Sequence, residues 1–351
     1  MFDSLLKKLP TRLLAPLISV TGATAVSNLV GFAVSVFAAR ALGAAAFGLY
    51  SLAFSLTTLT TAVAELGLNL ATIRLSNKYR EDRERLLTLW GSVLRSRMLV
   101  ITTLALVSVP LGLALARAIG LGTGQGGLLG VGMVTGAVLC FWTYFQSYLQ
   151  AHRRFGQLTG WILGYAGLRL ASLVVCYGAL GQSPVAWLVA IHMTPVLLVA
   201  VAGLLPRAAP LLEASLRDRR MTSELLREAL NYGKWVALSG IVYIAWPTVV
   251  RFMLATLASP EQVGVFSAGL TFSAVFSTIN TGVRAVMFPQ VTALTGLSQV
   301  QAYLSRMRKV APHYIGLATL AITALGMIQW LALGPEYRQA LPVFLVTALS
   351  S

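Results

Sequence analysis

The chain has 351 residues, of which 57% are hydrophobic and only 11% are charged, and its mean hydropathy is +0.76. This composition excludes an ordinary soluble domain, in which about 25% of residues are charged. The formal net charge of +16 fits either a nucleic-acid-binding protein or a membrane protein with basic loops. The positions of the basic residues along the chain therefore decide between these two classes.

Apolar segments recur along the whole sequence, and each is long enough to cross a hydrocarbon layer of about 30 Å as a helix. Alternating strands of about ten residues are absent, which argues against a barrel. The pattern predicts an all-α polytopic membrane protein. The ten expected spans cover residues 17–39, 49–72, 91–116, 128–150, 159–180, 185–205, 235–257, 264–288, 312–333 and 339 onward.

The basic residues fall in alternate loops between these spans. With a cytoplasmic N-terminus, nineteen lysines and arginines lie in the inner segments, and three, Arg40, Arg117 and Arg338, lie outside. The positive-inside rule thus predicts that orientation and accounts for the net charge without a nucleic-acid partner. Cys140 and Cys176 both fall in apolar segments and indicate neither a disulfide framework nor a metal site.

The longest inner segment, residues 206–234, contains TSELLREALNYGKW. Thr222 or Ser223 can cap a helix whose leucines share one face, which predicts an amphipathic linker on the membrane surface. A solvated basic loop attracted to anionic lipid is the alternative. The linker would separate an N-terminal lobe, residues 1–205 with helices 1–6, from a C-terminal lobe, residues 235–351 with helices 7–10.

An internal repeat supports this division. The segment ALGAAAFGLYSLAFS (41–55) finds an echo in LASPEQVGVFSAGLTFS (257–273), and Gly48, Tyr50 and Ser51 match the later residues Gly264, Phe266 and Ser267 at an offset of 216. The two copies have the same orientation, as expected for parallel repeats. We expect Gly43 and Gly48 to form a tight reversal between the first two spans. A two-lobed plan of six plus six or more helices leaves the C-terminal lobe incomplete in this chain.

Four stretches carry a family resemblance: TGATAVSNLVGFAVSVFAARALGAAAFGLYSLAFSL, AELGLNLATIRLSNKY, VGVFSAGLTFSAVFSTINTGVRAVMFPQVTAL and LGPEYRQALPVFLV. Together they resemble the O-antigen and exopolysaccharide flippases. These form the polysaccharide-transporter branch of the multidrug/oligosaccharidyl-lipid/polysaccharide exporter superfamily. The motifs are mostly glycine and apolar positions, so the resemblance is silent on the sugar substrate.

The resemblance implies twelve to fourteen helices in two lobes, and this chain departs from that pattern by ending at the tenth. It also implies alternating access and export of undecaprenyl-pyrophosphate-linked oligosaccharide across the bacterial cytoplasmic membrane. The expected partners are this lipid-linked oligosaccharide, membrane lipid, and the polymerase and chain-length proteins of the same pathway. No cofactor is implied.

Arginines inside predicted spans are the candidate substrate-binding residues, because a guanidinium binds phosphate bidentately and stays charged. Arg169, Arg251 and Arg284 lie well within the fifth, seventh and eighth spans. A snorkelled or structurally paired arginine is the alternative for each. Small residues at Gly160, Gly164 and Gly167 would allow another helix to approach closely beside Arg169.

Other polar residues in the spans have competing interpretations. Arg95 and Arg97 lie one to two turns into the third span, and we expect both to snorkel towards water. Glu65 is the only acidic residue within a span, and it is a candidate for cation coupling or for a structural ion pair. Asn69 and Asn280 are expected to form hydrogen bonds between helices.

Enzyme chemistry is not indicated. The sequence has no glycine-rich phosphate loop ending in GK[ST] and no nucleophile-with-base pattern. His152, His192 and His313 lack ligand spacing, so structural roles are expected. The remaining alternatives are a cation-coupled multidrug-type antiporter, a lipid II flippase and, from another class, a membrane glycosyltransferase. The last would be expected to carry a sizeable outer loop, and no expected outer segment exceeds about a dozen residues.

Overall fold

The computed structural model describes residues 11–179, 181–275 and 296–350. Within these ranges every regular element is helical, which confirms the all-α prediction. Residues 260–275 form one helical stretch. The other elements are α2 Thr11–Glu65, α3 Leu68–Lys78, α4 Arg83–Ala118, α5 Thr123–Ala151, α6 Phe155–Ala179, α7 Pro184–Leu188, η1 Val189–Met193, α8 Thr194–Val199, η2 Ala200–Leu204, α9 Leu205–Arg217, α10 Arg219–Leu257, α12 Leu297–Leu333, η3 Pro335–Tyr337 and α13 Ala340–Ser350.

Six helical segments of the described chain are long and apolar enough to cross a membrane. The first, Ile18–Lys78, has 61 residues and contains both of the first two predicted spans. Two shorter apolar helices, Ala318–Leu333 and Ala340–Leu349, overlap the last two predicted spans. The predicted eighth span, 264–288, lies only partly within the described residues. The multi-pass class is therefore established, while the number ten stays a prediction.

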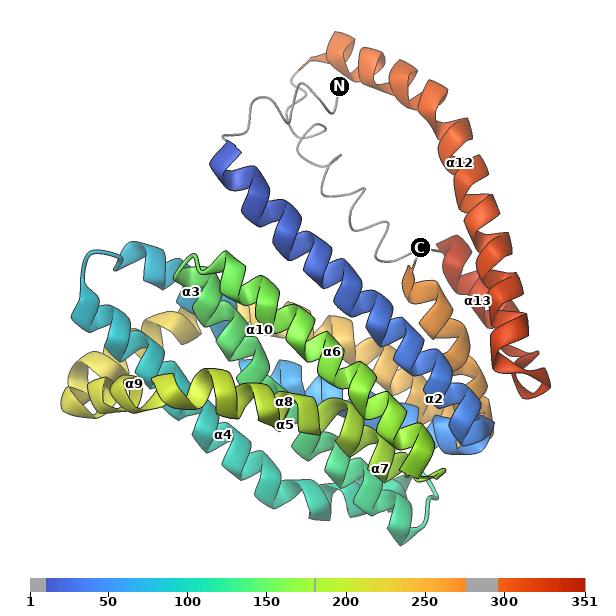
Figure 1. Ribbon diagram of the computed structural model, residues 1–351, viewed down its shortest axis with the longest axis horizontal. Coiled ribbons are helices and arrows are strands. Elements are labelled where there is room, and N and C mark those ends of the chain that lie inside the picture. Colours follow the sequence, from blue (N-terminus) through green and yellow to red (C-terminus); the bar gives the residue numbers. More distant parts are fainter. Residues whose placement is uncertain (1–10, 180, 276–295, 351) are drawn as a thin grey trace.

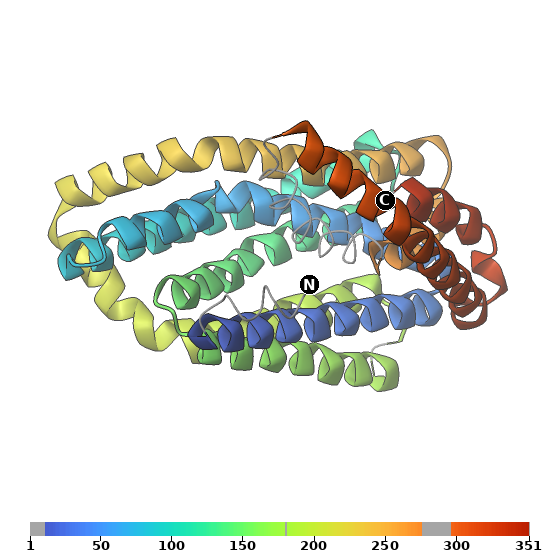
Figure 2. The ribbon, with the colours of Figure 1, turned by 90° about the horizontal axis from the view of Figure 1, so that it is seen from above.

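The helices form a bundle. Within it, α4 packs against α5 and α9, and α5 also packs against α2 (Figure 1). Seen from above, α10 lies along one side, whereas α6 and the first part of α2 lie along the other (Figure 2). One buried cluster joins α3, the start of α4, the end of α5 and α9, and a second joins the middle of α2 to residues 260–275 and α13.

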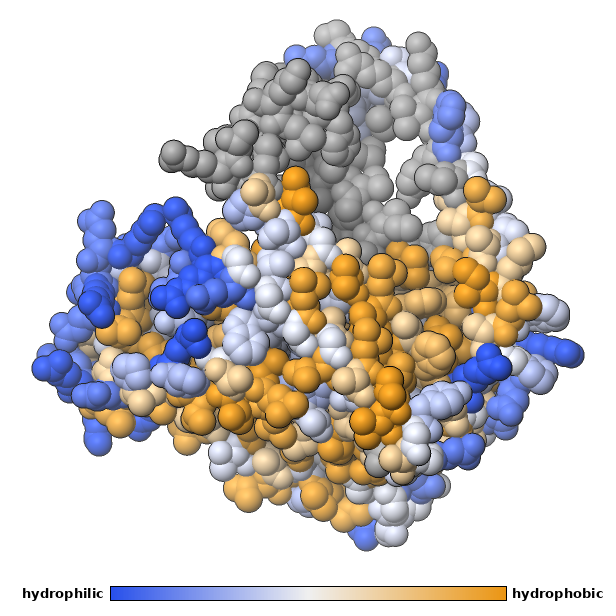
Figure 3. All heavy atoms as spheres, viewed as in Figure 1, coloured by the Kyte–Doolittle hydropathy of each residue, from blue (hydrophilic) through white to orange (hydrophobic). Residues whose placement is uncertain are grey.

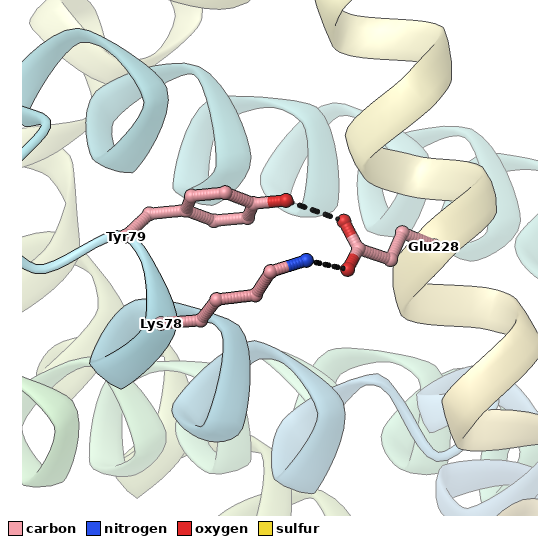
Figure 4. A network of polar contacts seen from close by, with 3 residues as sticks. All are labelled: Lys78, Tyr79 and Glu228. Carbon is pink, nitrogen blue, oxygen red and sulfur yellow. Dashed lines mark hydrogen bonds and ion pairs between the residues drawn. The ribbon is translucent and has the colours of Figure 1, made fainter.

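One end of the bundle, which we call the basic end, comprises the junctions between α3 and α4, α5 and α6, and α9 and α10. Its large hydrophilic surface borders a hydrophobic band (Figure 3). There the Lys78 ammonium lies 2.6 Å from a Glu228 carboxylate oxygen, and the Tyr79 hydroxyl donates to the other oxygen at 2.7 Å (Figure 4). These contacts fasten the end of α3 to α10.

The first two spans reverse at Gly43, one of the two glycines that we expected to form the turn. The element α2 consists of two helices joined at this residue, whose φ of 72° favours glycine. Before Gly43 the chain runs parallel to α6, and after it the chain runs back parallel to α5 (Figure 2). Gly48 lies inside the second helical part, so the expected turn at this residue is wrong. Because Gly48 has no side chain, another helix approaches its backbone closely, as described below. We call the region around this bend the distal end, because it lies opposite the basic end.

The linker begins its helix earlier than predicted. Asp218 caps α10 by accepting hydrogen bonds from the backbone N–H groups of Arg220 and Met221, at 2.9 and 3.0 Å. The predicted caps, Thr222 and Ser223, lie within the helix, so that prediction is wrong. An aspartate accepts such bonds at a helix start as well as serine does, and its negative charge also suits the helix dipole.

Close helix packing occurs on α5 rather than on α6. No atom of the described chain lies within 4 Å of a Cβ placed on Gly160, Gly164 or Gly167, so among the described helices the predicted contact face on α6 is not used. On α5, a Cβ on Gly132 or Gly136 would overlap carbonyl oxygens of α2.

Two hydroxyls reinforce this contact between α2 and α5. Thr57 donates to the Gly132 carbonyl at 2.8 Å, and Thr61 donates to the Gly136 carbonyl at 2.9 Å. Small residues and hydroxyl hydrogen bonds are what hold helices together where lipid removes the hydrophobic driving force.

The two glycine faces should therefore respond differently to a larger side chain. Gly136→Val would push α5 away from α2 and should lower the free energy of unfolding by about 1–3 kcal/mol. Gly164→Val, on the open face of α6, should change it by less than about 0.5 kcal/mol. Denaturant unfolding of both variants in detergent measures the difference, and equal losses would contradict the packing described here.

Candidate functional site: cations inside the helical bundle

Arg169 is a half-buried cation on α6 without a counter-ion. Its Nη1 atom lies 3.2 Å from the position that a Cβ on Gly31 would occupy, and its guanidinium carbon lies 5.8 Å from the centre of the Tyr165 ring. Its Nε is buried and has no hydrogen-bond partner among the residues that the structure describes. Within the described chain no carboxylate pairs with this guanidinium. The missing side chain of Gly31 leaves the room that the guanidinium fills.

Tyr50 and His192 form a buried pair of ring side chains. The Tyr50 hydroxyl and His192 Nε2 lie 2.8 Å apart, and the His192 ring stacks on Phe54 at 4.5 Å between ring centres. His192 belongs to η1, a π-helical segment, which is a feature found often at functional sites. Its hydrogen bond and burial agree with the structural role expected for this histidine. The π-helical turn itself has no sequence signal that we could have used.

Arg251 is half-buried on α10 and has two neutral partners. Its Nε donates to the Ser267 hydroxyl at 3.1 Å, and its Nη1 donates to the Pro247 carbonyl at 3.4 Å. The bond to Ser267 ties α10 to the helical stretch 260–275, whereas Pro247 lies on α10 itself. No carboxylate of the described chain pairs with this arginine either.

The internal repeat relates Arg169 and Arg251. Subtracting the offset of 216 from Pro247 and Ser267, the neighbours of Arg251, gives Gly31 and Ser51. Arg169 lies against Gly31. One neighbour of each guanidinium is therefore related by the repeat, although one arginine comes from the fifth predicted span and the other from the seventh. Sequence comparison alone misses this relation because residues 169 and 251 do not align.

The other two predicted site residues are Arg284 and Glu65. Arg284 lies outside the described residues, as does Asn280. Glu65 is half-buried at the end of α2 and forms no hydrogen bond or ion pair with any residue that the structure describes.

Arg97 is the buried cation that sequence reasoning misjudged. Its side chain is only 1% exposed, so the prediction of snorkelling is wrong for this residue, whereas Arg95 is exposed. Arg97 donates to the Cys140 carbonyl at 2.6 Å and also to Asn69 Oδ1. This bond confirms the interhelical role predicted for Asn69. Spacing along α4 could not reveal the burial, because it depends on the rotation of α4 against α3 and α5.

A helix break lies beside this cluster. Between α2 and α3 the chain turns through Leu66 and Gly67, with φ values of 49° and 67°. Gly67 packs against the Gly233 backbone of α10, where a Cβ would overlap the carbonyl. Irregular backbone within a membrane is tolerated where protein covers it, as α10 does here.

The remaining polar groups do not form a metal centre. The described residues contain no group of three histidine, cysteine or acidic side chains that could hold an ion. His152, in the junction between α5 and α6, hydrogen-bonds the Tyr148 carbonyl at 2.8 Å. Burial lowers the pKa of this histidine, so it is neutral near pH 7.

These features define a multi-pass helical membrane protein whose spans carry arginines without acidic partners in the described chain. The family model described as "Polysaccharide biosynthesis protein" matches residues 13–294. The chain therefore belongs to the polysaccharide biosynthesis protein family. No curated protein and no solved structure matches it.

Arg95 and Arg97 test the assignment of the buried cluster. Arg97→Met would remove the hydrogen bonds to Asn69 Oδ1 and to the Cys140 carbonyl, of which only the carbonyl keeps another donor, Thr143. The free energy of unfolding should therefore fall by about 1–3 kcal/mol. Arg95→Met on the same helix should cost less than about 0.5 kcal/mol. Unfolding in detergent measures both values. Equal, small effects would show that Arg97 also reaches water, as the snorkelling interpretation requires.

Proposed function

We propose that the protein flips undecaprenyl-pyrophosphate-linked oligosaccharide repeat units across the bacterial cytoplasmic membrane for O-antigen or exopolysaccharide synthesis. The mechanism is alternating access of a path between two lobes, with the N-terminus and the basic end in the cytoplasm. Family membership supports transport in polysaccharide biosynthesis. The observation that supports an anionic substrate is the charge of Arg169 inside the bundle, which has no acidic partner in the described chain.

The depth of Arg169 makes its charge costly. Gly31, against which it lies, precedes the bend at Gly43 by twelve residues. At 1.5 Å per residue this is about 18 Å along the helix, which is near the middle of a hydrocarbon layer of about 30 Å. A central arginine costs about 2.5–3.5 kcal/mol on insertion scales, so it normally faces a partner or a wet path.

An anionic substrate supplies the missing partner. The pyrophosphate of a lipid-linked sugar carries the charge that hydrocarbon excludes most strongly, and a guanidinium can bind two of its oxygens at once. Arg251 retains an Nη2 group without a partner in the described chain and can act in the same way in the second repeat. Arg284 is the third proposed contact.

Glu65 favours cation coupling of this transport. It is half-buried and unpaired within the described residues, so it is available to a proton or Na⁺. A cation-coupled multidrug-type antiporter would use the same group. The excess of arginine over acidic residues within the spans favours an anionic substrate over a cationic drug. A lipid II flippase shares the pyrophosphate chemistry and is distinguished by the sugar that is carried.

Binding of an isoprenoid pyrophosphate tests the role of Arg169. Purified protein in detergent should bind farnesyl pyrophosphate and not farnesol, because only the former carries the anion. Arg169→Ala should weaken binding by about tenfold or more, since hydrogen bonds to charged groups contribute about 1.5–3 kcal/mol. Isothermal titration calorimetry measures the affinity, and Arg95→Ala is the control on an exposed arginine.

Arg169→Lys separates charge from geometry. A lysine keeps the charge but cannot form the bidentate contact, so it should retain only part of the affinity. Wild-type affinity in both Arg169→Ala and Arg251→Ala would exclude the proposed contacts. Equal binding of farnesol would instead show that the isoprenoid chain alone is recognised.

A further inference from the structure

The two copies of the repeat touch one another at the distal end, and the contact is reciprocal. A Cβ on Gly48 would overlap the carbonyl oxygen of Pro260, and a Cβ on Gly264 would overlap the carbonyl oxygen of Ala44. The offset of 216 relates Gly48 to Gly264 and also Ala44 to Pro260. Each helix thus presents the same glycine to the same carbonyl of its counterpart. We call this contact the distal seam.

The seam begins at the bend in α2, and the bend needs a partner for a backbone group. Gly43 is not helical, so the Ala44 N–H leaves the pattern in which it would bond the Arg40 carbonyl. The Glu336 carboxylate, from the η3 turn 292 residues away, accepts this N–H at 3.3 Å. A buried N–H without an acceptor would be unfavourable.

Tyr337 adds a second bond from the same turn. Its ring is only 3% exposed, and its hydroxyl donates to the Ala39 carbonyl at 2.8 Å, one turn before the bend. Arg40 donates in return to the Ala332 carbonyl at 3.4 Å. The segment Gly334–Tyr337 therefore holds both sides of the bend at the end of the seam.

We propose that the distal seam is the gate that closes the path on the side opposite the basic end, and that Glu336 and Tyr337 are positioning residues that hold it closed. This inference rests on the proposed alternating-access function. The seam must separate to release substrate and re-form afterwards.

The chemistry of the seam suits separation. At its two glycines the two helices meet backbone to backbone. The buried apolar side chains around this contact, such as Phe47 against the Tyr337 ring, lose their contacts when the helices part. Glu336 and Arg40 are exposed, so water can replace their bonds when the bend moves. The Tyr337 hydroxyl is the buried bond, and its loss should bias the gate most directly.

A thiol reporter measures opening without any substrate. Ala268 lies one turn beyond Gly264 and is only 1% exposed. In a background with Cys140→Ser and Cys176→Ser, Ala268→Cys should react slowly with a membrane-impermeant maleimide. Tyr337→Phe should raise the labelling rate about fivefold, because one net hydrogen bond is lost from the closed state. Glu336→Ala should act in the same direction, and Gly48→Val should hold the seam open and give the fastest labelling.

Matched controls separate gating from damage to the fold. Tyr243→Phe and Gly240→Val alter an exposed tyrosine and an open glycine of α10, and both should leave labelling unchanged. Unfolding temperatures of the Tyr337→Phe and Glu336→Ala variants should stay near that of the parent. Wild-type labelling rates in these two stable variants would overturn the proposal. Faster labelling that appears only with a lowered unfolding temperature would overturn it as well.

The outcome is independent of the proposed substrate. Fast labelling of Tyr337→Phe supports the gate even if farnesyl pyrophosphate fails to bind the protein. Conversely, loss of binding in Arg169→Ala together with unchanged labelling of Tyr337→Phe would support the proposed substrate and overturn the proposed gate.

Discussion

Hydrocarbon offers no hydrogen-bond partner, so every polar group within the bundle needs one from the protein or from what the protein carries. In the described structure, polar groups of neighbouring helices pair with one another at several places. Thr57 and Thr61 bond the glycine carbonyls of α5, and Asn69 and the Cys140 carbonyl accept from Arg97. Arg169 differs from Arg97, because the described chain gives its guanidinium no hydrogen-bond acceptor, whereas Arg97 has several. An anionic substrate is the partner that we propose for this charge.

The helical membrane class could be predicted from composition and periodicity, because the length of an apolar segment alone determines whether it can span. Rotation of helices against each other could not. Arg97 and Arg95 differ by two residues on α4, yet one is buried and the other is exposed. The glycines of α6 and of α5 look alike in sequence, and only those of α5 meet another backbone. Such outcomes depend on tertiary packing, which spacing does not encode.

The repeat was visible in sequence, but its physical meaning was not. Gly48 was expected to form a turn and instead contacts the helix that contains its counterpart, Gly264. The repeated glycine therefore marks the place where the two related helices touch. The same offset relates Gly31, which lies against Arg169, to Pro247, whose carbonyl accepts from Arg251, although the two arginines come from different helices. Of the predicted site, Arg169 and Arg251 are related in this way, and Glu65 lies apart from them beside the Arg97 cluster.

Membership of the polysaccharide biosynthesis family and the position of Arg169 converge on a carrier of lipid-linked sugar. The most direct test is translocation in proteoliposomes that contain undecaprenyl-pyrophosphate-linked oligosaccharide with a fluorescent sugar. A membrane-impermeant quencher added outside reports which leaflet holds the sugar. The account predicts that wild-type protein exposes initially protected sugars to the quencher, and that Arg169→Ala exposes far fewer. Equal exposure in wild-type, Arg169→Ala and protein-free vesicles would contradict it.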